Sequence, residues 1–287
     1  MVVYKQYDQE SLDAQYNNRL HVPHYADYLK RWELLSRETE QNLPVRKDLP
    51  YGDLERERLD IYPSSKAGSK TLVFIHGGYW QMLDKSMFRF IANGFFAYDV
   101  TTVLINYPLA PDASMDEIVL SCRKAVQWLY HNVSSLNGDP DQIYVAGHSA
   151  GGHLAVMLMT TDWKLYDASL SANLLKGVCA VSGLFNLVPI YHSYLNKVLK
   201  MDRDTAECNS PLRLEPLIVC PLIVAVGEEE TAEFNDQSKE FFTCWKEKGM
   251  DVQFLQLAGE NHYSIVETLI NPKSVLSQVL RILMGGE

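Results

Sequence analysis

The sequence QIYVAGHSAGGHLAVMLMT, residues 142–160, decides how the rest of the chain is interpreted. Its apolar beginning predicts a buried strand, and its apolar end predicts a helix. Between them, residues 147–151 read GHSAG and match the pattern G-x-S-x-G. Between a strand and a helix, the glycines of this pattern permit a tight turn that raises a serine hydroxyl above the edge of a sheet. Ser149 is therefore the predicted nucleophile.

The residue after this serine has a predicted role of its own. Ala150 stands at the expected N-terminus of the helix, where a backbone N–H has no partner within the helix. The unpaired N–H and the helix dipole both favour an anion at this place. We therefore expect the Ala150 amide to face the oxyanion of a tetrahedral intermediate.

Short apolar runs recur on both sides of residues 142–160, with helical patterns between them. Such runs suit strands that are buried on both faces of a parallel sheet. The clearest helix, Ser114–His131, starts with capping-box spacing between Ser114 and Glu117, and a second helix over Ala232–Lys248 stops at Gly249. The pattern predicts an α/β fold of the hydrolase type, with a mostly parallel central sheet and helices on both faces. Its strands are expected at Thr71–Ile75, Val100–Asn106, Gln142–Ala146, Gly177–Val181, Pro221–Val226 and Val252–Leu257, and the alternating stretch Arg56–Tyr62 predicts a half-exposed strand.

We expect one domain over residues 1–287 with two additions to the alternating pattern. The first fifty residues are polar and rich in tyrosine, and they predict an N-terminal helical extension. Its main helix is expected in His24–Glu40, where apolar and aromatic residues recur at helical spacing. Residues 186–216 are too long for a simple connection, so we expect an inserted helical element there, a candidate lid.

Composition and charge limit the classes of partner. The 287 residues carry 26 basic and 36 acidic side chains, a net charge of −10, which argues against general binding of nucleic acid. The longest apolar run, Leu217–Val226, is too short to cross a bilayer, and the acidic N-terminus does not resemble a signal peptide. Five scattered cysteines without a C-x-x-C pair favour a reducing compartment. We expect a cytoplasmic protein without nucleic-acid or membrane partners; a nuclear location and a homodimer are both compatible with the sequence.

A second glycine motif directly follows the expected strand Thr71–Ile75. Residues 76–80 read HGGYW and match the start of the HGGG-type loop, which supplies oxyanion-hole amides in hydrolase-type folds. Removing one such donor typically costs about 2.7–4 kcal/mol of transition-state stabilisation. We expect His76 to form structural hydrogen bonds in this loop rather than to carry a proton.

The predicted serine needs a general base, which in the order serine–acid–histidine follows the last strand. His262 is the histidine in that position, and an imidazole suits proton transfer at neutral pH. We expect His148 to point away from the serine into packing and His153 to be buried. His192, in the insertion, is the one rival.

The acid should follow the strand before the last one. The strand Pro221–Val226 leads into Gly227–Phe234, where four glutamates stand close together. The role of the acid is to hold the imidazole tautomer and to stabilise the imidazolium. Spacing permits Glu228, Glu229 or Glu230 and does not choose among them.

Other chemistries find little support in the sequence. It contains no H-E-x-x-H motif, no phosphate loop and no G-x-G-x-x-G motif, and its cysteines and histidines do not cluster at zinc spacing. We therefore expect neither a metal nor an organic cofactor.

Taken together, these motifs resemble the kynurenine formamidase (arylformamidase) branch of the α/β-hydrolases. The H-G-G-x-W form of the oxyanion loop is characteristic of that family. The stretches Asp13–Arg19 (DAQYNNR), Val226-Gly227 and Glu233-Phe234 are also similar to it. The resemblance covers the chain from about residue 10 to the end, and it is weakest in the insertion and at residues 63–70.

The resemblance implies particular residues for each role. It places the triad acid at Glu230, where many relatives carry aspartate, and the oxyanion donors at the amides of Gly77, Gly78 and Ala150. It also implies a reaction, the hydrolysis of N-formyl-L-kynurenine to L-kynurenine and formate in tryptophan degradation.

Two hypotheses concern the substrate pocket. Tyr79 and Trp80 are expected to shrink the acyl side of the pocket to the size of a formyl group or to stack on the aryl ring. Candidates to bind the charged amino-acid group lie in the insertion, at Tyr191, His192, Tyr194 and Asn196. The alternatives to a formamidase are a carboxylesterase for short-acyl aryl esters and a non-catalytic ligand receptor on a hydrolase fold.

Overall fold

The computed structural model describes residues 1–286, and an eight-stranded sheet runs through its centre in the order β10-β9-β8-β7-β5-β6-β4-β3. The six strands from β10 to β6 are parallel, whereas β4 pairs antiparallel with both β6 and β3. The predicted fold class is therefore confirmed. The strands are β3 Arg46–Pro50, β4 Arg58–Tyr62, β5 Ser69–Ile75, β6 Thr101–Ile105, β7 Gly138–His148, β8 Leu175–Val181, β9 Leu222–Gly227 and β10 Val252–Leu257.

The strand over residues 58–62 differs from its prediction, because four of its five residues are buried. The alternating pattern predicted a half-exposed strand, but β4 is an inner strand between β6 and β3. The edge strand β3 was not predicted, since Arg46, Lys47 and Asp48 are polar and a proline ends the strand. Polar residues and proline are typical of edge strands, whose outer side meets solvent.

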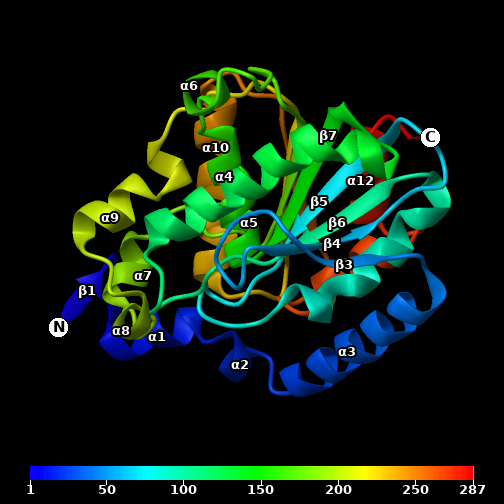
Figure 1. The fold of residues 1–287 in the computed structure, drawn as a ribbon. Coiled ribbons are helices and arrows are strands. Elements are labelled where there is room, and N and C mark those ends of the chain that lie inside the picture. Colours follow the sequence, from blue (N-terminus) through cyan, green and yellow to red (C-terminus); the bar gives the residue numbers. More distant parts are fainter. Residues whose placement is uncertain (287) are drawn as a thin grey trace.

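Helices cover both faces of the sheet (Figure 1). Along β5, Val73 and Ile75 pack on the side of α4 and α5, whereas Leu72 and Phe74 pack on the side of α3, η1 and α12. This alternation follows from the two-residue period of a strand. The larger helices are α3 Tyr25–Asn42, η1 Lys85–Gly94, α4 Met115–Asn132, α5 Ala150–Met159, α10 Ala232–Glu247 and α12 Val275–Leu283.

The expected helix beginning near Ser114 has the predicted cap. The Glu117 amide donates to Ser114 Oγ over 3.4 Å, and the Glu117 carboxylate accepts from the Ser114 amide over 2.8 Å. The remaining helices are short: α6 Trp163–Tyr166, α11 Ser264–Glu267, η2 Phe96–Tyr98, η3 Val133–Leu136 and η5 Thr268–Ile270. No helix within residues 1–286 is long and apolar enough to cross a membrane.

The N-terminal extension is more than helical. It begins with a small hairpin of β1 Val2–Tyr4 and β2 Tyr7–Asp8, continues through α1 Gln9–Tyr16, α2 Asn18–His21 and α3, and ends in β3. Residues 186–216 form the short elements α7 Val188–His192, α8 Asn196–Leu199, α9 Arg203–Cys208 and η4 Pro211–Arg213. In Figure 1, β1 and α1 lie beside α7 and α8, although the two segments are far apart in sequence. The function of residues 186–216 as a lid stays a prediction.

Candidate active site

Ser149 occupies a strained turn between β7 and α5. Its backbone has φ 58° and ψ −120°, a conformation that places the side chain outside the line of the strand and the helix. The turn needs glycine two residues later, because a Cβ on Gly151 would lie 1.9 Å from the backbone oxygen of Ile75. The Ser149 hydroxyl makes no hydrogen bond within residues 1–286, so it is free to turn toward a base or a substrate.

The oxyanion loop lies directly beside this serine. A Cβ on Gly77 would lie 3.0 Å from Ser149 Cβ and 3.0 Å from the His148 oxygen, so a larger residue would crowd the serine and its neighbour. The amides of Gly77, Gly78 and Ala150 have no acceptor in the described part of the chain. Three free N–H donors around one hydroxyl make an arrangement that can stabilise a tetrahedral oxyanion.

Glu230 and His262 form a buried pair. His262 Nδ1 lies 2.6 Å from Glu230 Oε2, and the residues are 5% and 7% exposed, respectively. An ionised carboxylate only accepts hydrogen bonds, so Nδ1 carries a proton and Nε2 is left as the acceptor. By contrast, Glu228 and Glu229 are exposed. Among the three glutamates that spacing allowed, Glu230 is the one the structure brings to the histidine.

The other oxygen of this carboxylate is also fixed. Glu230 Oε1 accepts from Ser182 Oγ over 2.5 Å and from the Gly227 amide over 2.8 Å. Hydrogen bonds to a carboxylate are stronger than neutral ones. The Glu230 side chain is therefore held by donors from the residue after β8, from the end of β9 and from the loop of His262.

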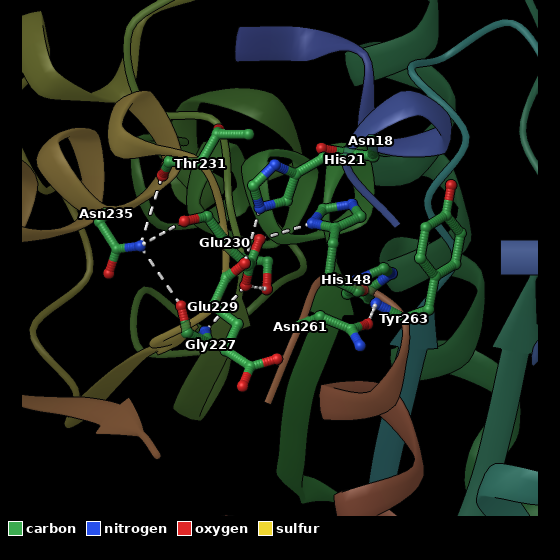
Figure 2. Close-up of polar contacts among 12 residues, drawn as sticks. Asn18, His21, His148, Gly227, Glu229, Glu230, Thr231, Asn235, Asn261 and Tyr263 are labelled. Carbon is green, nitrogen blue, oxygen red and sulfur yellow. Dashed lines mark hydrogen bonds and ion pairs between the residues drawn. The ribbon is translucent and has the colours of Figure 1, made fainter. Parts of the chain in front are cut away.

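Asn235 fixes the backbone of the loop that carries the acid. Its side-chain amide donates to the carbonyl oxygens of Gly227, Glu230 and Thr231 over 3.1–3.3 Å (Figure 2). The side chain is 8% exposed, so these carbonyls are paired away from solvent. Sequence reasoning missed this residue, and its only signal was a polar residue on the inner face of the α10 helix.

A cavity of about 330 Å³ opens above the serine. Its wall includes Ser149, His148 and His262 together with Gly78 and Tyr79 of the oxyanion loop. The N-terminal extension supplies Asn17, Asn18, Arg19, Leu29 and Trp32, and the insertion supplies Tyr194, Leu195 and Val198. Asn17, Asn18 and Arg19 belong to the stretch Asp13–Arg19, which the sequence analysis named only as similar to the family. Neither that similarity nor the periodicity predicted that these residues line the cavity.

Some expected pocket residues lie elsewhere. Trp80 is fully buried and donates from Nε1 to His153 Nδ1 over 3.1 Å, so it packs in the core and does not line the cavity. Tyr191, His192 and Asn196 are also absent from the cavity wall: the Tyr191 and His192 rings contact each other, and the Asn196 side chain bonds the backbone of Met201. Of the candidates in the insertion, only Tyr194 lies in the wall.

His76 holds the oxyanion loop through its buried ring. Its ring stacks on Tyr107 with centroids 4.5 Å apart, and its Nδ1 lies 2.7 Å from the Gly77 oxygen. Complete burial lowers the pKa of His76 to about 4, so the ring is neutral at physiological pH. It does not line the cavity, which agrees with a structural role.

A serine beside free backbone donors, with a histidine–carboxylate pair on the same cavity, defines a serine hydrolase of the α/β-hydrolase class. The sequence also matches the family model described as BD-FAE over residues 59–242. It is similar to the kynurenine formamidase of Danio rerio, with 38% identity over 83% of this chain and 81% of that protein. Identity to the kynurenine formamidase of Salmo salar is 35% over the same shares. The chain belongs to the kynurenine formamidase family.

The fold is also found in a solved structure. A proposed thioesterase from Silicibacter sp. TM1040 superimposes with a TM-score of 0.83 at 29% identity, covering 93% of this chain and 98% of that one. Because it covers 93% of this chain, the similarity includes residues outside the stretch matched by the BD-FAE model.

Proposed function

We propose that this protein hydrolyses N-formyl-L-kynurenine to L-kynurenine and formate. The observation that carries the proposal is the buried Glu230–His262 pair on the cavity that Ser149 lines, in a chain of the kynurenine formamidase family. The names of the similar fish proteins supply the substrate, and the geometry supplies the chemistry.

The proposed reaction starts when His262 Nε2 takes the proton of Ser149 and the serine oxygen attacks the formyl carbon. The amides of Gly77, Gly78 and Ala150 stabilise the oxyanion of the tetrahedral intermediate. The protonated His262 then gives its proton to the aniline nitrogen, the carbon–nitrogen bond breaks, and kynurenine leaves. A formyl group remains as an ester on Ser149.

The second half of the reaction repeats these steps with water. His262 takes a proton from a water molecule as its oxygen attacks the formyl ester, and the same oxyanion donors stabilise the intermediate. The proton returns to Ser149 when formate leaves. Glu230 stays ionised throughout and stabilises the imidazolium.

The second candidate function is a carboxylesterase for short-acyl aryl esters. The similarity to a proposed thioesterase favours it, since thioesters and esters use the same triad and oxyanion donors. A non-catalytic receptor is less well supported, because the positions of serine, histidine and acid are all filled.

An absorbance assay separates these functions. Purified protein is given N-formyl-L-kynurenine and, separately, 4-nitrophenyl acetate, with Ser149→Ala as the matched inactive variant. Faster specific turnover of the formamide, lost in the variant, supports the proposal. Turnover of the ester without the formamide supports the carboxylesterase, and absence of both supports the receptor.

We also propose a cytoplasmic location and no nucleic-acid or membrane partner. Cys122, Cys179 and Cys220 are buried as free thiols, which suits a reducing compartment. A homodimer is the simplest assembly for such a chain and is included in the proposal. Fractionation of cells and light scattering of the purified protein test the two parts.

A further inference from the structure

Arg19, on the short helix α2, lies in the wall of the cavity that also holds Ser149 and His262. No other lysine or arginine lines this cavity, and no aspartate or glutamate lines it, in the described residues 1–286. The cavity of an acidic protein therefore contains one positive charge that no carboxylate of the wall neutralises.

The guanidinium of Arg19 is held by weak partners. Nη2 lies 3.2 Å from the sulfur of Met82, and Cζ lies 5.4 Å from the ring centre of Tyr25. Arg19 forms no ion pair within residues 1–286. A guanidinium offers five N–H donors, and a thioether is a weak acceptor, so most of these donors are free to bind an anion.

The positive charge reaches two aromatic residues of the cavity wall. Burial raises the pKa of Tyr194 and raises the pKa of Tyr263 to about 12, while the nearby Arg19 charge opposes both shifts. Both tyrosines line the cavity. Figure 2 shows Tyr263 beside the loop of Asn261, and Asn18, next to Arg19 in sequence, on the helix above it.

The remaining wall suits an aromatic ligand. Leu29, Trp32, Tyr79, Leu195, Val198 and Tyr263 give it apolar and aromatic surface in the same cavity as the arginine and the serine. A molecule that carries a formamide, an aryl ring and a carboxylate has a matching group for each of these three parts of the wall.

We propose that Arg19 binds the carboxylate of an aryl formamide substrate and so selects carboxylate-bearing substrates over analogues that lack the carboxylate. Planar guanidinium groups bind carboxylates with two parallel hydrogen bonds, which fixes the ligand as well as attracting it. The inference rests on the proposed function for the identity of the substrate, but not for the role of the arginine.

Binding to the inactive Ser149→Ala protein tests this role without catalysis. Calorimetry compares N-formyl-L-kynurenine with its decarboxylated analogue, N-formylkynuramine. The carboxylate compound is expected to bind about 10- to 100-fold more tightly, as charge-assisted hydrogen bonds provide. Adding Arg19→Ala should reduce this advantage to about 2-fold or less, and Arg19→Lys, which keeps the charge but loses the fork, should give an intermediate value.

Arg37→Ala is the matched control, because Arg37 is an exposed arginine of α3 that does not line the cavity, and it should leave the advantage unchanged. Higher salt should weaken binding of the carboxylate compound more than binding of its analogue. Equal affinities for the two compounds, an advantage that survives Arg19→Ala, or absence of binding by both would overturn the inference. If this binding pattern holds but wild-type protein does not hydrolyse the formamide, the proposed function fails while the role of Arg19 stands.

Discussion

The imidazole of His148 lies against that of the proposed base His262, with ring centroids 4.7 Å apart, and its Nε2 donates to the His262 backbone oxygen over 2.9 Å. A carbonyl oxygen only accepts, so Nε2 of His148 carries a proton. Burial and the charge of a protonated His262 both lower the pKa of His148 well below its usual value. His148 therefore stays neutral when His262 takes the proton of the serine. The expectation that His148 would pack away from the serine missed this contact with the loop of the base.

His148→Phe should keep the ring packing and lose the hydrogen bond to the His262 loop. We expect kcat to fall about 5-fold with KM nearly unchanged, because one lost hydrogen bond of about 1 kcal/mol loosens the base. Steady-state kinetics with formylkynurenine measure both constants. His148→Gln can donate to the same carbonyl and should recover part of the loss. An unaltered kcat in His148→Phe would show that His148 does not position the base.

Glu230→Gln should reduce kcat by about 10³- to 10⁴-fold, because a neutral amide neither holds the required tautomer nor stabilises the imidazolium. The controls are Glu228→Gln and Glu229→Gln, which alter exposed side chains and should leave kcat within about 2-fold. The measurement is turnover of formylkynurenine, with circular dichroism as the check of folding. A similar loss in all three variants would show that the assignment of the acid is wrong.

Asn235→Ala should lower both the stability of the protein and its kcat. The Glu230 carbonyl loses its side-chain donor, while the Gly227 and Thr231 carbonyls keep only their backbone donors, so we expect the free energy of unfolding to fall by about 1–3 kcal/mol. Urea denaturation measures the stability, and kcat reports the displaced Glu230. Asp236→Ala, at the neighbouring exposed position, should change neither quantity; a stable and fully active Asn235→Ala protein would contradict the role of this side chain.

Trp80→Phe should leave the choice of acyl group unchanged, since Trp80 is buried against His153 and does not line the cavity. We expect a loss of about 1–3 kcal/mol in stability from the smaller ring and the lost N–H. Tyr79→Ala removes a large side chain from the wall and so enlarges the cavity. It should improve hydrolysis of butyryl esters relative to formyl esters. Rates on the two esters decide the matter, and an altered preference in Trp80→Phe would restore the size-filter hypothesis for that residue.

The protein should lose stability in mild acid. Burial lowers the pKa of His76 and of His153 from 6.5 in the unfolded chain to about 4. Each neutral ring therefore contributes stability above pH 6.5 that is lost as the pH falls from 6.5 to about 4, at up to about 1.4 kcal/mol per pH unit. Urea denaturation between pH 7.5 and 4.5 gives the slope. His153→Gln should flatten it, whereas the exposed His131→Gln should not, and a slope identical in all proteins would refute this source of acid sensitivity.

The strand–turn–helix around Ser149 could be predicted because its chemistry is local: a glycine-bounded turn joins two apolar runs. His262 followed from chain order alone. The acid could not be chosen from the residues, because Glu228, Glu229 and Glu230 all follow the same strand and only tertiary burial separates them. The resemblance to a family supplied that choice.

The edge strand β3 and the hairpin β1–β2 were missed for a different reason. The polar residues of β3 have low strand propensity, and pairing with β4 overrides it, whereas β1 and β2 are only three and two residues long, too short for a strand pattern to show. Likewise, the spacing of apolar residues predicts which face of a helix is buried, but it does not predict which helices contribute residues to the cavity wall. The contribution of Asn17, Asn18 and Arg19 to the cavity depends on how the extension folds back over the sheet.

The extension also connects parts of the site that lie far apart in sequence. Thr231 Oγ1 donates to the Gln15 oxygen over 2.8 Å, and Tyr79 Oη donates to the Tyr16 oxygen over 2.7 Å, so consecutive carbonyls of one helix anchor the acid loop and the oxyanion loop. The BD-FAE match starts only at residue 59. Because one helix of the leading segment accepts hydrogen bonds from both loops, a substitution that shifts α1 would disturb the carboxylate and the oxyanion donors together.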